Sequence, residues 1–281
     1  MDCLFINLDR QADRRAALTD SFRRWAPPHW TLRRLPAVDA AEVGRMAWPG
    51  SLSDGAKACL LSHRRAIEGH RGQSRPLLIL EDDARLGPST CAAVEQILAM
   101  AGSAAKAPNW DLLFTDVILA DLESMVRHAR RRPMLMAQRQ VELADLQDLS
   151  FAGSTAYILH PQAVDTLAAL LAAASGDGTP LNTPYDLLLR QWVRQRHLRA
   201  WMTFPFLTTV AASADESQIQ VGEAASADRV WNAYRRAMWF DRQDAELQAD
   251  LEHLRREICE EESDRIGTII SAGLSSRIRW K

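Results

Sequence analysis

The sequence predicts an α/β domain with a mostly parallel sheet flanked by helices, followed by an α-helical C-terminal extension. The first observation is a run of four aliphatic residues, 77–80, that leads directly into Glu81, Asp82 and Asp83. A short apolar run without alternation is typical of a strand buried on both faces. The second is the opening of the chain, where an apolar run passes through a turn into a helical repeat. The third is a change to helical periodicity amid many charges from about residue 224.

The composition is that of an ordinary globular protein. The 281 residues are 47% hydrophobic and 25% charged, enough for one large domain with or without an extension. A formal net charge of −2 predicts no nucleic-acid partner. Four cysteines without metal-type spacing predict reduced thiols and a cytoplasmic location. The start lacks a secretory pattern and no apolar run reaches about 18 residues, so we expect no transmembrane segment.

The three acids after the apolar run are the first candidate site. Buried strands of open α/β sheets deliver their functional groups at the carboxyl end, and three adjacent carboxylates there need a counter-charge. Mg²⁺ or Mn²⁺ suits this role, because carboxylate oxygens are preferred ligands and the open positions could accept nucleotide phosphates. The alternative is a solvated loop rim in which Asp82 caps a turn or a helix.

The first two predicted strands each lead to charged residues. Residues 3–8 form the first strand, and Arg10 and Arg14 follow where a βα turn would meet a nucleotide diphosphate. Ordinary salt bridges on a solvated helix explain either arginine equally well. Residues 31–38 form the second strand, and Asp39 after it could hydrogen-bond a ribose, as in dinucleotide-binding folds.

Ser53 is predicted to cap the next helix. The apolar face of this helix includes Cys59 and His63, and Lys57 lies nearby on the same helix. By spacing alone, a packed and hydrogen-bonded histidine is favoured over a catalytic one.

The middle of the chain continues the pattern of strands and helices. The remaining predicted elements are a helix from Ser89 to residue 100, strands at 111–114, 151–159 and 199–203, and a helix after Pro161. The strand at 111–114 is predicted to end beside Asp116. Residues 119–147 have a weaker pattern with an arginine-rich run, which is typical of a solvated face; a phosphate-bearing or anionic-lipid partner is the alternative.

Asp186 has two explanations. Thr183, Pro184 and Asp186 suit the N-cap, N1 and N3 positions of a helix, which is nearly a capping box. This pattern accounts for Asp186 without any catalytic role.

The C-terminal region predicts one or two amphipathic helices packed on the main domain or on a partner. Trp231 and Trp239 beside arginines would also suit a membrane interface. Packing on protein is favoured, because the glutamates between residues 257 and 262 would repel anionic lipid.

Several segments, in order along the chain, carry a family resemblance. They are FINLDRQADRR, AVDA, SDGAKACLLSH, LILEDDARL, FAGSTAYILHPQAVDTL, TPYDLLL and the ES of DESQI. Together they resemble glycosyltransferase family 25, the lipooligosaccharide galactosyltransferases and their procollagen-modifying relatives. The resemblance implies a GT-A fold, a Rossmann-like catalytic domain over residues 1–222, with residues 223–281 as a helical extension outside the family pattern. Ser53-Asp54-Gly55 departs from the family, which has Gly-Glu or similar there.

The resemblance also implies roles for individual residues. The metal ligands would be Glu81, Asp82 and Asp83, with Asp83 as the direct one. The base would be Asp186 or, as second candidate, Glu216. The residues implied to contact the nucleotide-sugar are Asn7, Asp9, Arg10, Arg14, Asp39, Lys57, His63, Asp82 and Gly153.

We therefore predict a metal-dependent, inverting glycosyltransferase that moves a sugar, galactose first, from a UDP-sugar to a glycan or other hydroxyl acceptor. Mn²⁺ or Mg²⁺ is the expected cofactor, and a peripheral contact with the inner face of the membrane is a further expectation. One alternative is a nucleotidyltransferase on a similar scaffold, which would release pyrophosphate instead of UDP. Another is a silent nucleotide-sugar-binding module, against which the presence of three acids argues.

Overall fold

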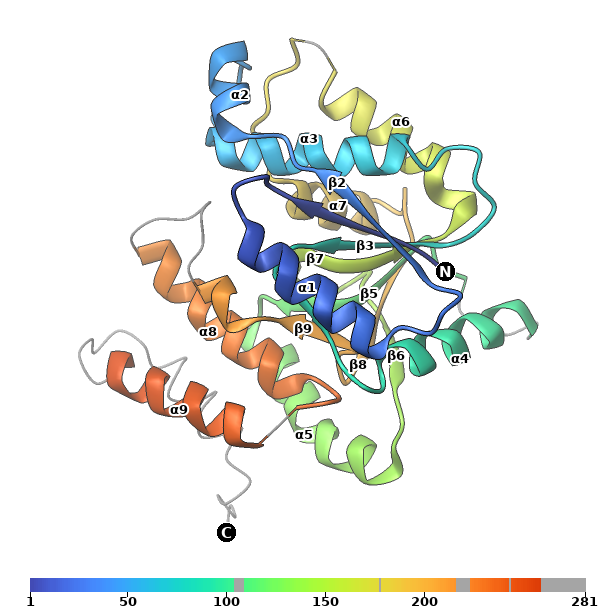
Figure 1. Ribbon diagram of the computed structural model, residues 1–281, viewed down its shortest axis with the longest axis vertical. Coiled ribbons are helices and arrows are strands. Elements are labelled where there is room, and N and C mark those ends of the chain that lie inside the picture. Colours follow the sequence, from blue (N-terminus) through green and yellow to red (C-terminus); the bar gives the residue numbers. More distant parts are fainter. Residues whose placement is uncertain (104–108, 177, 216–222, 243, 259–281) are drawn as a thin grey trace.

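The computed structural model describes residues 1–103, 109–176, 178–215, 223–242 and 244–258. Helices lie on both sides of a central sheet, and α8 and α9 lie next to each other at one edge of the molecule (Figure 1). The strands are β1 Asp2–Asn7, β2 Thr31–Pro36, β3 Leu77–Glu81, β4 Ala84–Leu86, β5 Leu112–Leu119, β6 Glu142–Asp145, β7 Phe151–Leu159, β8 Ala200–Phe204 and β9 Thr208–Val210. The α-helices are α1 Ala12–Trp25, α2 Ala40–Met46, α3 Asp54–Glu68, α4 Thr90–Ser103, α5 Leu122–Gln138, α6 Val164–Ala174, α7 Tyr185–Arg194, α8 Glu223–Met238 and α9 Asp244–Ile258.

The central sheet has the strand order β2-β1-β3-β7-β5-β8-β6. Strand β1 pairs in parallel with β2 and β3, and β5 pairs in parallel with β8. Strand β7 runs antiparallel to its neighbours β3 and β5, and β6 runs antiparallel to β8. Five of the seven strands, all except β7 and β6, therefore point in the same direction. This mostly parallel arrangement confirms the predicted α/β class and agrees with a Rossmann-like GT-A fold. Strands β4 and β9 form a separate antiparallel ribbon.

Strand β3 is buried on both faces, as predicted. Leu77 and Ile79 pack into a core with side chains of α3, α6 and α7. Leu78 and Leu80 pack into a second core with side chains of α1 and α4. These helices cover opposite faces of the sheet (Figure 1). The carboxyl end of β3 therefore emerges between two helical layers, and this places Glu81 at the edge of the sheet.

Helix α8 belongs to the first of these cores. Val230, Ala233 and Ala237 are buried in it, and the Tyr234 hydroxyl donates to the carbonyl of Met125 in α5 at 3.0 Å. The helix thus packs on protein, as its amphipathic pattern predicts. Among the described helices, none is both long and apolar enough to cross a membrane. The domain boundary at residue 222 stays a prediction.

The start of α7 differs from the prediction. Pro184, not Thr183, occupies the N-cap position, and the helix begins at Tyr185. Asp186 is therefore the second helical residue, and the predicted capping box does not form. Proline can take this position because its missing N–H is one that the helix start leaves unpaired.

Two further predictions are corrected in β5 and α5. Asp116 lies inside β5 rather than beyond its end, at a place where the pairing register with β7 shifts. The arginine-rich run lies on α5, but Arg132 is buried and donates to the carbonyl of Trp239 at 2.6 Å. A solvated face is therefore wrong for Arg132, whose side chain joins α5 to the end of α8.

Candidate active site

A cavity of about 720 Å³ opens at the carboxyl ends of β1 and β3. Its walls come from the β1–α1 turn, α3, β7, the start of α7, and α8. Open α/β sheets bind ligands at this edge, and the volume suits a small-molecule site. The predicted site residues that line the cavity are Arg10, Arg14, His63, Glu81, Asp82, Asp83, Gly153 and Asp186.

The three acids at the end of β3 have different partners. Asp82 accepts hydrogen bonds from Asn7 Nδ2 at 2.7 Å and from Arg14 Nη1 at 3.4 Å. Arg14 Nη1 also lies 3.9 Å from Asp83 Oδ2. Arg14 therefore supplies part of the counter-charge that adjacent carboxylates need. Glu81 is bonded from another side of the cavity.

Glu81 joins a chain of hydrogen bonds that we call the buried wall, consisting of His63, Glu81, Ser154, Tyr157 and Tyr185. Glu81 Oε1 accepts from Ser154 Oγ at 2.6 Å and lies 3.2 Å from His63 Nε2. His63 Nδ1 lies 3.0 Å from the Tyr157 hydroxyl, which lies 2.8 Å from the Tyr185 hydroxyl. The His63 ring stacks on Tyr185 with centroids 4.3 Å apart. His63 is therefore packed in the protein and also lines the cavity.

The acids differ in how their surroundings shift their pKa values. Burial acts to raise the pKa of Glu81, but the hydrogen bonds and electrostatic attraction of His63, Ser154 and Arg235 together outweigh it, and the pKa is lowered. Burial, followed by the charge of Glu81, raises the pKa of Asp83 to about 7. Burial also raises the pKa of Asp82, although Asn7 and Arg14 oppose it. The crowded carboxylates therefore do not ionise alike.

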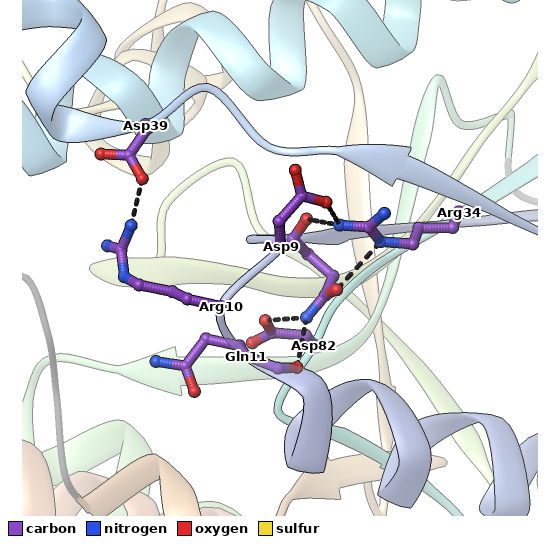
Figure 2. A network of polar contacts seen from close by, with 7 residues as sticks. Asp9, Arg10, Gln11, Arg34, Asp39 and Asp82 are labelled. Atoms are coloured by element: carbon purple, nitrogen blue, oxygen red, sulfur yellow. Dashed lines mark hydrogen bonds and ion pairs between the residues drawn. The ribbon is translucent and has the colours of Figure 1, made fainter.

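A second and more exposed network lies at the β1–α1 turn, and we call it the charged rim, consisting of Asp9, Arg10, Arg34 and Asp39. Figure 2 shows Arg10 directed at Asp39 and Arg34 directed at Asp9. Arg34 donates to Asp9 at 2.5 Å and to the Asn7 carbonyl at 3.0 Å. The rim is thus linked through Asn7 to Asp82, which Figure 2 also draws.

Four residues that were predicted to contact the nucleotide-sugar lie outside the cavity lining, namely Asn7, Asp9, Asp39 and Lys57. Asn7 is 1% exposed, and its side-chain amide donates a hydrogen bond to the Asp82 carboxylate. Asp39 caps α2 by accepting from the Ala41 N–H at 2.8 Å. Lys57 is buried and donates to the Trp48 carbonyl at 2.7 Å. These residues support the loops around the cavity, and direct contact with a ligand stays a prediction for them.

Gly153 and Asp186 meet where β7 passes the start of α7. Gly153 has a φ of +86°, a left-handed conformation that favours glycine. Its N–H donates to Asp186 Oδ2 at 2.9 Å, and Asp186 Oδ1 accepts from the Leu187 N–H at 2.9 Å. Asp186 thus ties two elements together and still lines the cavity. Glu216, the second base candidate, lies outside the described residues.

The residues present fit a divalent cation at Asp83. Its Oδ1 atom is buried and has no hydrogen-bond partner within the described part of the chain. Hard cations prefer such carboxylate oxygens, and Asp82 and Glu81 flank this one in sequence. Cys59, His63 and Glu81 are a second donor set, with ligand atoms within 4.8 Å of one another, of types that zinc accepts. Both ring nitrogens of His63 already have partners, so Asp83 fits better.

Sequence reasoning missed Arg235 and Asn232, which both come from α8, are buried and line the cavity. It also missed Ser154, Tyr157 and Tyr185 of the buried wall. One signal was available. Asp116 lies among apolar strand residues and Arg235 lies among apolar helix residues, and a buried charge needs a partner.

Comparison with known families decides the class of the protein. Residues 1–189 match the family described as glycosyltransferase family 25 (LPS biosynthesis protein). The chain belongs to glycosyltransferase family 25. No curated protein matches it. In this family-25 glycosyltransferase the three acids, the buried wall and Asp186 lie inside the matched segment, whereas Asn232 and Arg235 lie beyond it.

Proposed function

We propose that this family-25 glycosyltransferase transfers a sugar, galactose first, from a UDP-sugar to a hydroxyl group of a glycan acceptor, with inversion and with a divalent metal. The observation that carries the proposal is the buried Oδ1 of Asp83, which has no hydrogen-bond partner within the described part of the chain, on a residue that lines the same cavity as Arg14. A nucleotide diphosphate needs two groups in its site. One is a carboxylate that can bind the metal ion, and the other is a guanidinium that can pair with phosphate.

The chemistry requires stabilisation of the leaving group, because negative charge builds on the β-phosphate as UDP departs. Mn²⁺ or Mg²⁺ held by Asp83, with Asp82 or Glu81, would supply Lewis-acid stabilisation of that charge. Arg14 would orient the diphosphate through its N–H groups. The hydrogen bonds from His63 and Ser154 in the buried wall hold Glu81 in one orientation.

Inversion also requires a base that takes the proton of the acceptor hydroxyl. Asp186 is our candidate, because among the described residues that line the cavity it is the one carboxylate outside the three acids. Two backbone N–H groups fix its orientation.

The reaction is tested by screening UDP-sugars for Mn²⁺-dependent hydrolysis, first without acceptor and then with candidate glycans. Release of UDP is expected, and release of pyrophosphate from a nucleoside triphosphate would instead indicate a nucleotidyltransferase. Asp83→Asn should abolish the metal-dependent turnover and leave the fold intact. Asp20→Asn, a surface change on α1 where the side chain is 68% exposed, is the control. Wild-type turnover in Asp83→Asn would rule out this metal site.

The base is tested by Asp186→Asn. Transfer should fall by a factor of roughly 10² to 10⁴, while UDP-sugar binding, measured by calorimetry, persists. Asp165→Asn is the matched control, because Asp165 lies in the first turn of α6, as Asp186 does in α7, but does not line the cavity. Transfer by Asp186→Asn at the wild-type rate would leave only a structural role for this residue.

The proposed location is the cytoplasm, with a peripheral contact at the inner face of the membrane where a lipid-linked glycan would be met. Free thiols at Cys3, Cys59 and Cys91 support a reducing compartment. Co-sedimentation with anionic vesicles tests the membrane contact.

A further inference from the structure

Arg235 of α8 and Asp116 of β5 form an ion pair inside the protein. Their side chains are 5% and 0% exposed. Arg235 Nε donates to Asp116 Oδ1 at 2.8 Å and Nη2 donates to Oδ2 at 2.5 Å. A buried pair of this kind adds little net stability compared with apolar side chains, because desolvation of both charges offsets their attraction. Stability alone is therefore a weak reason for its presence.

The position of the pair gives a better reason. Arg235 lines the cavity, as do Asn232 on the same helix, Asp83 after β3 and Arg14 on α1. Arg235 Nη1 donates to Asn232 Oδ1 at 3.2 Å. Together with the two bonds to Asp116, this occupies three of the five N–H donors that a guanidinium carries. Within the described part of the chain, two N–H donors of Arg235 therefore remain for a ligand in the cavity.

We propose that Arg235 binds the diphosphate of the donor, with Asp116 and Asn232 as its positioning residues. Helix α8 then completes a site that the family-matched segment, residues 1–189, leaves incomplete. The inference rests on the proposed nucleotide-sugar donor. A guanidinium matches the geometry of phosphate oxygens, and one held rigidly by a carboxylate needs little reorganisation when charge develops on them. With Arg14, the diphosphate would meet cations from both ends of the chain.

Calorimetric titration with UDP and with uridine, each with and without Mn²⁺, tests the inference. Arg235→Met should weaken UDP binding by about tenfold to a hundredfold, the range for lost hydrogen bonds to a charged group. Uridine binding should not change, because uridine has no phosphate. Arg236→Met is the matched control. Arg236 is the next residue of α8 and also pairs with a carboxylate, Asp250 at 2.8 Å, but it does not line the cavity.

Two further variants separate ligand binding from folding. Arg235→Met leaves Asp116 as an uncompensated buried charge, which destabilises the fold. The double variant Asp116→Leu/Arg235→Met removes both charges and should show the same selective loss of UDP affinity. Asp116→Asn keeps the guanidinium but weakens its orientation, so it should give a smaller loss, again without an effect on uridine.

The outcomes distinguish this inference from the proposed donor. If wild type binds UDP and the Arg235 variants bind it as tightly as Arg236→Met does, Arg235 has only a structural role and the inference is wrong. Equal losses for UDP and uridine would also overturn it, because they indicate a general disturbance of the cavity. If wild type binds no UDP at all, the donor proposal and the inference both fail.

Discussion

The two polar networks beside the cavity differ in burial, and this difference separates their roles. In the buried wall, His63 is 1% exposed and Tyr157 is 0% exposed. In the charged rim, the side chains of Arg10 and Asp9 are 52% and 85% exposed. Water screens an exposed ion pair, and the entropy of two long side chains offsets much of the attraction. A buried donor or acceptor that loses its partner has no water to replace it.

The difference in burial separates a fixed part of the site from a part that can rearrange. Arg10 of the charged rim, which lines the cavity, can exchange the carboxylate of Asp39 for a phosphate at little energetic cost, because water and salt already weaken the present pair. The groups of the buried wall cannot exchange partners in this way. The buried wall therefore sets the shape of the cavity, and the rim is the part that can respond to a ligand.

His63→Asn should have the largest effect, because it breaks the middle of the buried wall. The change leaves the Tyr157 hydroxyl or the Glu81 carboxylate without its present partner. We expect the free energy of unfolding to fall by about 1–3 kcal/mol, and sugar transfer per folded molecule to fall by roughly tenfold or more. Urea unfolding and steady-state kinetics measure the two effects.

A matched control is His29→Asn, because the His29 side chain is 63% exposed. Its unfolding free energy should change by less than about 0.5 kcal/mol. An unchanged urea midpoint for His63→Asn would contradict the view that the buried wall fixes the cavity.

Alkaline pH should give the next largest effect, through Cys59 on α3 beside the buried wall. Burial raises the pKa of the Cys59 thiol well above its ordinary value. The folded protein therefore keeps this proton after the unfolded chain loses it near pH 8.5–9, at about the ordinary thiol pKa. Below that pH, the Cys59 thiol makes its full contribution to the free energy of unfolding. Above it, the free energy of unfolding declines by about 1.4 kcal/mol per pH unit for one thiol.

Urea unfolding of wild type and Cys59→Ala at several pH values between about 8 and 10 measures this effect. The variant should lose stability less steeply, by the share of one thiol. In the charged rim, stability depends on pH in the opposite direction. The Ala41 N–H and Arg10 lower the pKa of Asp39, although burial opposes them. Its contribution is present at neutral pH and is lost only as the pH falls through the acid range. Equal alkaline slopes for the two proteins would contradict the prediction for Cys59.

Local pattern was enough to predict the backbone that carries the buried wall. A strand buried on both faces has no polar position, so the unbroken run before Glu81 predicted β3 and placed the acids at its end. Ser53 caps α3 as predicted, with its hydroxyl accepting from the Ala56 N–H at 3.2 Å. Helical spacing then put Cys59 and His63 on the side of α3 that lines the cavity.

Contacts between distant segments could not be predicted in this way. The direction of β7 between β3 and β5 leaves no trace in the period of its side chains. Asp116 and Arg235 are 119 residues apart. The pattern around each residue suggested a local role, so their pairing was not predicted. Asp186 lies at a helix start, as predicted, but its carboxylate reaches Gly153 on β7. The hydrogen bonds of the site are mostly of this long-range kind.

Asp9→Asn should have the smallest effect, and it tests whether the ion pairs of the charged rim hold the rim in place. Arg34 donates to Asp9, but it also donates to Asn7 Oδ1 and to the Asn7 carbonyl, each at 3.0 Å. The two bonds to Asn7 should keep Arg34 in position when the Asp9 charge is removed. We expect the free energy of unfolding to fall by less than about 0.5 kcal/mol, and by still less in high salt. Urea unfolding at two salt concentrations measures this, with Asp20→Asn as an exposed control outside the rim. A loss of more than about 1 kcal/mol would exceed what exposed pairs contribute, and the rim would then be as tightly coupled as the buried wall.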